Sequence, residues 1–176
     1  YDLKGRLIKK TDALGREKHL TYDPNDNIVY EKTADDPFSI ETTFDYSNRP
    51  INHTMIARNG TSLSTSSHYN SLHQKTEEID AQGNATSYTY NPFGHPTTTC
   101  LPPLDIERPN IEKTFNALGK VTKETDSLGN TTQTFYTSWG KPYRMIFPDH
   151  SEEFFFYTLD GQLKTHLSKE GIRTEF

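Results

Sequence analysis

Aromatic residues recur along the chain at a nearly constant spacing, and alternating apolar and polar residues precede many of them. The recurring aromatic positions are Tyr1, Tyr22, Phe44, Tyr69, Tyr90, Phe115, Tyr136 and Tyr157. The intervals between them are 21, 22, 25, 21, 25, 21 and 21 residues. A regular period of this length predicts a tandem repeat in which each unit is one supersecondary element. The period-two spacing of Lys18, Leu20 and Tyr22, which ends on an aromatic ring, is typical of a half-buried strand.

Two turn signals follow each recurring aromatic residue. A glycine slot lies four residues after it and a second slot lies ten residues further on, as Gly5 and Gly15 show in the first repeat. Where glycine is missing, the replacements are Asp26, Asn48 and His73 in first slots and His150 in a second slot. Asp, Asn and His are the residues other than glycine that best tolerate a positive φ angle. The slots therefore predict left-handed backbone, in type I turns followed by an αL residue and a bulge.

An aspartate or asparagine precedes most of the first slots by three residues. These residues are Asp2, Asp23, Asp45, Asn70, Asn91 and Asn116. Their side chains can accept hydrogen bonds from the amides of their own turn. We therefore expect each repeat to supply two turns and two short strands, so that residues 1–176 form eight hairpin repeats.

Some repeats depart from this scheme. Asn59-Gly60 in the third repeat predicts a two-residue hairpin turn, and the second turn of the second repeat is expected near Asp36-Pro37. The proline-rich residues 101–109 cannot form a central strand and predict a surface loop. Pro50, Pro96 and Pro142 each lie two residues after a first slot, at positions where we expect no ladder hydrogen bond.

The composition favours a sheet with little enclosed core. Apolar residues make up 31% of the chain and the mean hydropathy is -0.85, values low enough to raise disorder as a hypothesis. The aromatic residues argue against disorder because eight of them keep one repeat position. We therefore predict an all-β fold, in which neighbouring strands stabilise a long, narrow antiparallel sheet with one or both faces wet. Because strands twist, such a sheet is expected to coil.

Charge and cysteine content narrow the possible partners. The net charge is -5, and lysine and arginine are scattered singly, so we expect no nucleic-acid partner. Cys100 is the only cysteine, which excludes an internal disulfide and a cysteine metal cluster. No apolar run approaches the length of a membrane span, and no signal peptide is present. Since the chain also lacks an initiator methionine, and the next aromatic is due just beyond Phe176, we expect a fragment of a longer array.

Enzymatic and metal-binding interpretations find little support in the spacing of polar residues. The histidines do not follow metal-binding offsets, so neither a metal nor a cofactor is predicted. The aspartates recur as turn residues, although a chance pair of carboxyl groups at the distance of about 5 Å used by retaining glycosidases stays open. No serine or cysteine lies in a nucleophile elbow. We expect a non-catalytic chain.

Aromatic side chains leave one binding hypothesis open. Trp139 lies at a predicted turn tip, and with Tyr88, Tyr90 and Tyr136 it could offer stacking platforms to sugars. The alternative is that the recurring tyrosines stack on their neighbours and hold strand register, with each cross-strand aromatic pair contributing up to about 1 kcal/mol. The second interpretation is favoured because the tyrosines follow the repeat.

The repeated register resembles a known family. The residues that carry this resemblance are Tyr1, Asp2, Gly5, Arg6 and Leu7, followed by Asp12 and Gly15 and then by a Tyr-x-Tyr pattern. Together they resemble the YD repeat of the RHS family over essentially the whole chain. The resemblance implies a β-strand spiral that forms part of a hollow shell, as in bacterial RHS toxins, the C-component of Tc toxins and the animal teneurins. In the bacterial members, this shell holds a C-terminal toxin domain.

The family's autoproteolytic Asp-Pro-x-Gly-Leu segment has no counterpart here. The nearest match, residues 91–95, lies in an ordinary first-turn slot. The resemblance therefore implies a structural shell segment whose partners are further repeats and an enclosed C-terminal effector or toxin domain of its own polypeptide. It also implies a secreted or cell-envelope location in a bacterium. The alternative is a cell-surface repeat module that binds carbohydrate or protein receptors, and a hydrolase is a distant third.

Overall fold

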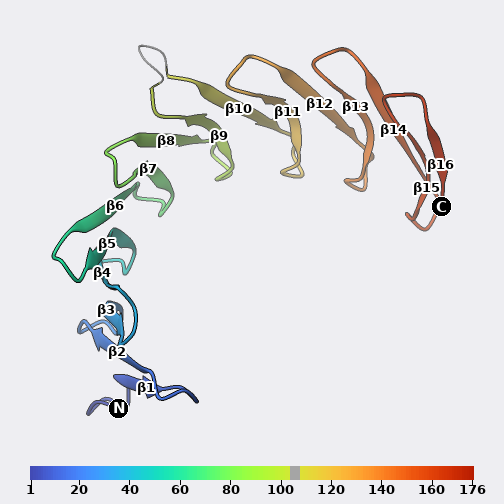
Figure 1. Cartoon of the computed structure of the whole chain (residues 1–176). Coiled ribbons are helices and arrows are strands. Elements are labelled where there is room, and N and C mark those ends of the chain that lie inside the picture. The colour runs from blue at the N-terminus through green and yellow to red at the C-terminus, as the bar shows by residue number, and fades with distance from the viewer. Residues whose placement is uncertain (104–107) are drawn as a thin grey trace. The chain divides into compact units, whose positions relative to one another are not determined.

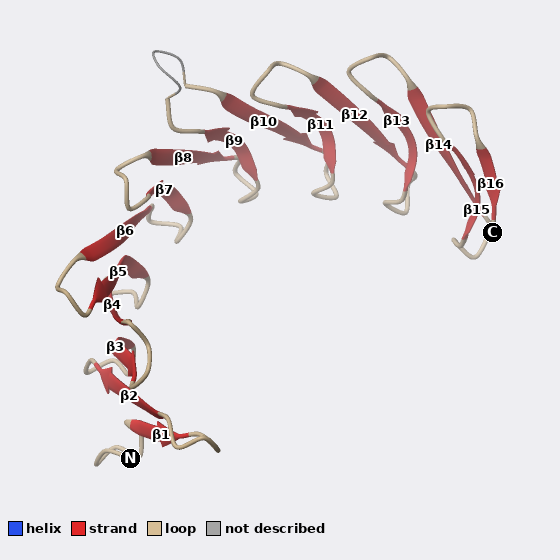
Figure 2. Ribbon diagram, in the orientation of Figure 1, coloured by secondary structure: helices blue, strands red, loops and turns tan. Residues whose placement is uncertain are grey.

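Strands and tight turns account for nearly all of the described structure. The computed structural model describes residues 1–103 and 108–176, and these residues contain sixteen strands and no helix (Figures 1 and 2). The chain divides into two compact units, residues 1–86 and residues 87–176. The all-β fold of tandem hairpin repeats predicted from the sequence is confirmed.

The first unit is an antiparallel meander in which strand order follows sequence order. Its strands are β1 (Lys9–Thr11), β2 (Glu17–Tyr22), β3 (Ile28–Thr33), β4 (Phe38–Phe44), β5 (Pro50–Ala57), β6 (Ser62–Tyr69) and β7 (Lys75–Ile79). Each strand pairs with the next one along the chain, from β1 with β2 to β6 with β7. Strand β8 (Ala85–Tyr90) begins at the end of this unit and continues into the second.

The second unit continues the same architecture. After β8 come β9 (Pro96–Cys100), β10 (Asn110–Phe115), β11 (Val121–Thr125), β12 (Thr131–Tyr136), β13 (Pro142–Ile146), β14 (Glu152–Tyr157), β15 (Leu163–Leu167) and β16 (Arg173–Glu175). Every strand pairs antiparallel with its successor, so turns alternate between the two ends of the strands, as Figure 1 shows from β8 to β16.

A β-bulge marks each recurring aromatic residue inside the sheet. Strands β2, β4, β6, β8, β10, β12 and β14 all end on one of these residues, and the register shifts there. Pro50, Pro96 and Pro142 begin their strands opposite such an aromatic residue. Because a bulge disrupts the ladder locally, proline is tolerated there without loss of a regular hydrogen bond.

The turn backbone agrees with the predicted slots. Asp26, Asn48, His73 and His150 have φ angles of 69°, 60°, 63° and 64°, so all four replacements for glycine adopt the left-handed conformation. In the first turn, the Gly5 amide donates to the Asp2 carbonyl over 3.0 Å and the Asp2 amide donates to the Arg6 carbonyl over 2.9 Å. This pair of bonds closes a type I turn followed by a bulge, as predicted.

Two local predictions need correction. The connection at Asn59-Gly60 is not a two-residue turn, because the Gly60 amide donates to the Ala57 carbonyl over 2.9 Å and the Ala57 amide donates to the Thr61 carbonyl over 2.8 Å. Gly60 is left-handed and Asn59 is not, so the connection repeats the turn found elsewhere in the chain. The second turn of the second repeat spans residues 33–36, which places it slightly before the predicted Asp36-Pro37.

The predicted loop over residues 101–109 falls partly outside the described residues, which stop at 103 and resume at 108. The described part contains no strand before Asn110, and the Leu101 amide donates to the Pro109 carbonyl over 2.9 Å. This bond closes the connection between β9 and β10.

The described residues form almost no enclosed core. Leu20, Gly161 and Thr165 are the only buried residues among them, and Leu20 and Thr165 each have 8% of their surface exposed. Threonine pairs across adjacent strands connect hydroxyl groups over 3.0–3.1 Å instead, at Thr89 with Thr97, Thr114 with Thr122 and Thr125 with Thr131. Stability therefore depends on strand ladders and on contacts between neighbouring repeats, as expected for a solenoid-like array.

Candidate functional site

The turns form two chemically different edges in each unit. The first turns follow the recurring aromatic residues and comprise residues 2–5, 23–26, 45–48 and 70–73 in the first unit and 91–94, 116–119, 137–140 and 158–161 in the second. The second turns comprise residues 12–15, 33–36, 57–60 and 80–83 in the first unit and 126–129, 147–150 and 168–171 in the second. Because the strands are antiparallel and sequential, the first turns of a unit share one edge of its sheet and the second turns share the other. We call these edges the first-turn edge and the second-turn edge.

Aspartate and asparagine side chains close the turns on both edges. Asp2 Oδ1 accepts the Lys4 and Arg6 amides, each over 2.9 Å, and its Oδ2 accepts Arg6 Nε over 2.7 Å. Asn116 Oδ1 accepts the corresponding two amides, of Leu118 and Lys120, over 3.0 Å. These bonds confirm the capping role predicted for the recurring aspartates and asparagines.

The turn bonds also shift the acidity of the carboxyl groups. The pKa of Asp12 lies below its ordinary value chiefly because the Arg16 amide donates to the carboxylate. The pKa of Asp80 and of Asp126 is lowered first by the side-chain amides of Asn84 and Asn130, respectively. A carboxylate held in its charged form by its own turn is a poor candidate for the proton donor of an acid/base pair.

The hydroxyl groups of four recurring tyrosines bind backbone of the preceding repeat. Tyr22, Tyr69, Tyr136 and Tyr157 donate to the carbonyls of Leu7, Pro50, Val121 and Pro142 over 2.8, 3.1, 2.9 and 2.7 Å. Each acceptor lies just after a first turn of the preceding repeat. The tyrosine that begins one repeat therefore fixes the first turn of the repeat before it, a contact that sequence reasoning did not identify.

Cationic side chains make a second bridge between neighbouring first turns. The Arg6 guanidinium lies 4.7 Å from the centre of the Tyr22 ring, and its Nη1 donates to the Asp23 carbonyl over 2.9 Å and to Asp26 Oδ1 over 2.7 Å. Arg49 repeats this arrangement, 4.8 Å above the Tyr69 ring.

The same bridging position continues in the second unit. Lys141 lies over the Tyr157 ring and donates to the Gly161 carbonyl, and the His95 ring stacks on Phe115 with 4.8 Å between centres. Arg6, Arg49, His95 and Lys141 all directly follow a first slot. This recurrence was the sequence signal for the bridges, and it was missed.

The four residues predicted as a stacking platform for sugars do not share one strand or turn. Tyr88 and Tyr90 lie on β8, whereas Tyr136 ends β12 and Trp139 lies in the turn that follows it. Three strands separate β8 from β12, a distance of roughly 19 Å between the two strands at the usual strand spacing. Trp139 packs edge-on against Tyr157, with ring centres 5.9 Å apart. Their binding of a sugar stays a prediction.

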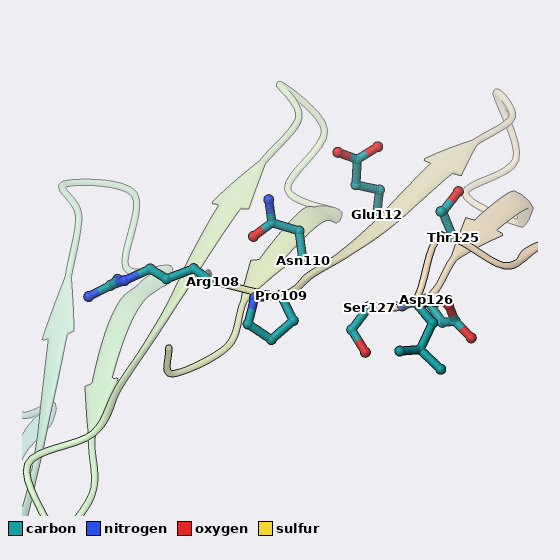
Figure 3. A pocket seen from close by; sticks show the side chains of 9 residues that line it. Arg108, Pro109, Asn110, Glu112, Thr125, Asp126 and Ser127 are labelled. Atoms are coloured by element: carbon teal, nitrogen blue, oxygen red, sulfur yellow. Dashed lines mark hydrogen bonds between the residues drawn. The ribbon is translucent and has the colours of Figure 1, made fainter. Parts of the chain in front are cut away.

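An open cleft of about 490 Å³ lies on the second-turn edge of the second unit (Figure 3). Asn110 and Glu112 of β10 line it on one side, and Thr125, Asp126 and Ser127, where β11 meets its following turn, line the other. Asp126 already accepts the Leu128 and Asn130 amides and the Asn130 side chain over 2.9 Å. The cleft is therefore lined by the carboxyl groups of Glu112 and Asp126, and that of Asp126 is already bound by its own turn.

Metal-ligating side chains do not gather in the part of the chain that the structure describes. Within residues 1–103 and 108–176, no cluster of three or more histidine, cysteine, aspartate or glutamate side chains is arranged to bind a metal ion. The same residues hold no helix with the length and apolar character needed to cross a membrane.

A tandem hairpin array whose recurring residues serve its own turns and repeat contacts is a structural repeat. Comparison with known proteins agrees. The family model of the RHS Repeat matches residues 1–37 and 69–100, so these two stretches are similar to RHS repeats. A search of curated protein sequences finds no match.

Solved structures of Tc toxin components share the fold. TcdB2-TccC3 without the hypervariable C-terminal region aligns with a TM-score of 0.65 and 12% identity, covering 94% of this chain and 11% of that chain. TcdB2-TccC3-TEV gives 0.60 and 12%, covering 98% and 12% of the respective chains. The Photorhabdus luminescens Tc holotoxin pore gives 0.62 and 13%, covering 94% and 11%. The chain thus spans about one ninth of the length of the proteins that it resembles.

Proposed function

We propose that this chain is a wall segment of a hollow β-shell that encloses a C-terminal effector or toxin domain of its own polypeptide. The observation that carries the proposal is the use of recurring residues to hold a neighbouring repeat. Tyr22 and Arg6 illustrate it, because the first binds the Leu7 carbonyl and the second binds Asp23 and Asp26. Side chains committed to neighbouring repeats build a continuous surface.

The same commitment supports a non-catalytic role. Recurring aspartates such as Asp12, Asp80 and Asp126 cap turns through two backbone amides each. Catalytic carboxyl groups require an environment that favours proton exchange near the working pH, whereas these turns favour the charged form. We assign any enzymatic activity of the parent protein to domains outside residues 1–176.

The similarity to Tc toxin components supports this assignment and a secreted location in a bacterium. The similar structures include complexes of TcdB2 and TccC3, which align with 94–98% of this chain. We propose that the partners of this segment are further repeats and the enclosed domain. A wall of this kind acts by exclusion, because proteases and other macromolecules cannot pass a hydrogen-bonded sheet.

Limited proteolysis of the full-length parent protein tests the proposal. We expect a C-terminal fragment to stay intact and to co-elute with the repeat region on size exclusion while exposed loops are cut. The control is the same protein unfolded in denaturant, in which the fragment should be digested at once. A C-terminal region that is digested in the native protein as fast as in the control would contradict enclosure.

A further inference from the structure

Four successive first turns of the second unit each expose a large apolar side chain. These residues are Phe93, Leu118, Trp139 and Leu159, with 84%, 60%, 53% and 106% of their surface exposed. First turns lie two strands apart, so the four side chains are spaced at roughly 10 Å along one edge. We call this row the apolar crest. Exposed apolar patches on a soluble protein mark interaction sites, and a row with one such residue in each successive turn differs from hydrophobic residues scattered singly.

Two side chains of the apolar crest pack against the turn that follows them. Leu118 lies 3.9 Å from the position that a β-carbon at Gly140 would occupy, and Trp139 lies 3.0 Å from the corresponding position at Gly161. Each of these two side chains therefore leans over the glycine of the next turn. The Trp139 ring is also held against Tyr157. This packing fixes side chains that solvent alone would leave free to rotate.

Charges beside the crest differ in sign from those on the opposite edge. Lys120 and Lys141 lie in the crest turns or directly after them, against the single acidic residue Asp160. The second-turn edge of the same unit carries the acidic residues Asp126, Asp149 and Glu170 and the single lysine Lys169. The crest edge is therefore net positive and the second-turn edge is net negative.

The second-turn edge also has room to receive side chains. A β-carbon placed at Gly129 or Gly171 in the second unit, or at Gly15, Gly60 or Gly83 in the first, would meet no atom within 4 Å. Second turns recur at the same two-strand interval as the crest residues. The spacing of the crest therefore matches the spacing of the spaces between second turns.

We propose that the apolar crest is a lateral seam, which docks against the second-turn edge of another row of the same hairpin repeats in the parent polypeptide. This inference rests on the proposed function. Strand pairing joins the repeats along the sheet, but a closed wall also needs contacts along the two turn edges. The strands of the second unit have three to six residues, so a single row is only about 20 Å wide at most. Apolar side chains of one row seated between acidic turns of the next would seal the wall sideways.

Photo-crosslinking in the full-length protein tests the seam directly. The amino acid p-benzoylphenylalanine is placed at position 159, and crosslinked peptides are identified by mass spectrometry. We expect them to come from second turns of other repeats. The matched control places the same amino acid at position 63, because Leu63 on β6 is 61% exposed but lies outside every turn. Crosslinks from position 159 to non-repeat segments or to lipid would overturn the proposal, and so would the absence of any crosslink.

A double variant tests the lateral seam separately from the proposed enclosure. Leu118→Ser with Leu159→Ser should accelerate digestion of the C-terminal fragment about tenfold or more, because burial of one leucine favours the closed state by at least that factor. Leu63→Ser is the control and should leave the rate unchanged. A protected fragment in the double variant would overturn the seam and leave the proposed function standing. A fragment that is unprotected in the unmodified protein would overturn the proposed function, whereas crosslinks between repeats would still support the seam.

Discussion

The first-turn and second-turn edges share one backbone turn but differ in how far their side chains reach. On the first-turn edge, Arg6 and Arg49 cross to the next turn, and Trp139 and Lys141 reach Gly161. On the second-turn edge, most turns bind only themselves, as Arg16 does with Asp12. The exceptions are Arg58, which donates to the Ala34 carbonyl over 3.1 Å, and Lys169, whose Nζ lies 5.5 Å from the centre of the Phe147 ring. Cohesion between repeats is thus concentrated on one edge of the ribbon.

The largest expected contrast comes from glycines at equivalent places on the two edges. Gly161 and Gly129 have φ angles of 82° and 85°, so alanine at either position costs about 1–2 kcal/mol for left-handed backbone. Gly161→Ala should lose at least about 1 kcal/mol more, because its methyl group meets Trp139 at 3.0 Å. Gly129→Ala meets nothing within 4 Å.

Urea unfolding of the two variants measures this contrast. Trp139 is the single tryptophan of the chain, so its fluorescence should also change in Gly161→Ala and stay constant in Gly129→Ala. Equal losses in the free energy of unfolding, with an unchanged emission spectrum in both variants, would show that the first-turn edge is not more tightly packed.

Two arginines give the next largest contrast. Arg6 and Arg16 each directly follow a glycine slot, and each donates Nε to the aspartate four residues before it over 2.7 Å. Arg6 alone stacks on a tyrosine and binds the next turn. Arg6→Ala should therefore lower the free energy of unfolding clearly more than Arg16→Ala does, because the Arg16 contact is a surface ion pair and contributes little. Chemical denaturation that ranks the two losses equally or in reverse order would refute the bridge.

The tyrosine hydroxyl groups should show a smaller effect. Tyr136→Phe removes the hydrogen bond to the Val121 carbonyl and keeps the ring, so we expect a loss of about 0.5–1.5 kcal/mol in the free energy of unfolding. Tyr143→Phe is the control, because this exposed side chain makes no hydroxyl hydrogen bond in the described residues. No difference between the two variants would assign the repeat contact to the ring alone.

The pH dependence of the turn caps should be the smallest effect. The pKa of Asp126 is lower in the folded chain than its ordinary value of 3.8, first because of the Asn130 side-chain amide. The unfolded chain therefore binds more protons near this pH. The stabilising contribution of Asp126 is complete above about pH 4 to 5 and is lost as the pH falls through the lowered pKa.

Asparagine at position 126 checks the origin of that dependence. Asn70, Asn91 and Asn116 cap first turns with the same two backbone bonds, so Asp126→Asn should keep the turn and weaken the pH dependence of unfolding below about pH 4. Thermal unfolding from acid to neutral pH gives the comparison. A variant with the same acid sensitivity as the unmodified chain would place the titrating group elsewhere.

The sequence was informative where backbone geometry restricts residue type. A left-handed residue is confined to glycine, asparagine, aspartate and few others, so the repeat positions of His73 and His150 were enough to assign both residues to turns. Asn59-Gly60 was misassigned because the same dipeptide suits two connections, and only the pairing of Ala57 with Thr61 distinguishes them.

Contacts between repeats were harder to predict. The bridges of Arg6 and Arg49 depend on which turns become neighbours across two strands, and the sequence separation between arginine and ring is 16 residues in one case and 20 in the other. The tyrosine hydroxyl bonds likewise join residues that lie 15 or 19 positions apart in the sequence. Neither the arginine nor the tyrosine contact follows from residue preference alone.

The third repeat suggests how arrays of this kind change length over generations. Its interval of 25 residues exceeds the common 21 by four, and β5 and β6 have eight residues each, where many other strands have five or six. Additions shared in pairs between two partner strands leave every side chain on its original face. Because so few side chains are enclosed, no distant packing has to adapt. Insertions and deletions of even size within a hairpin, or of a whole hairpin, should therefore be the heritable changes that this architecture tolerates best.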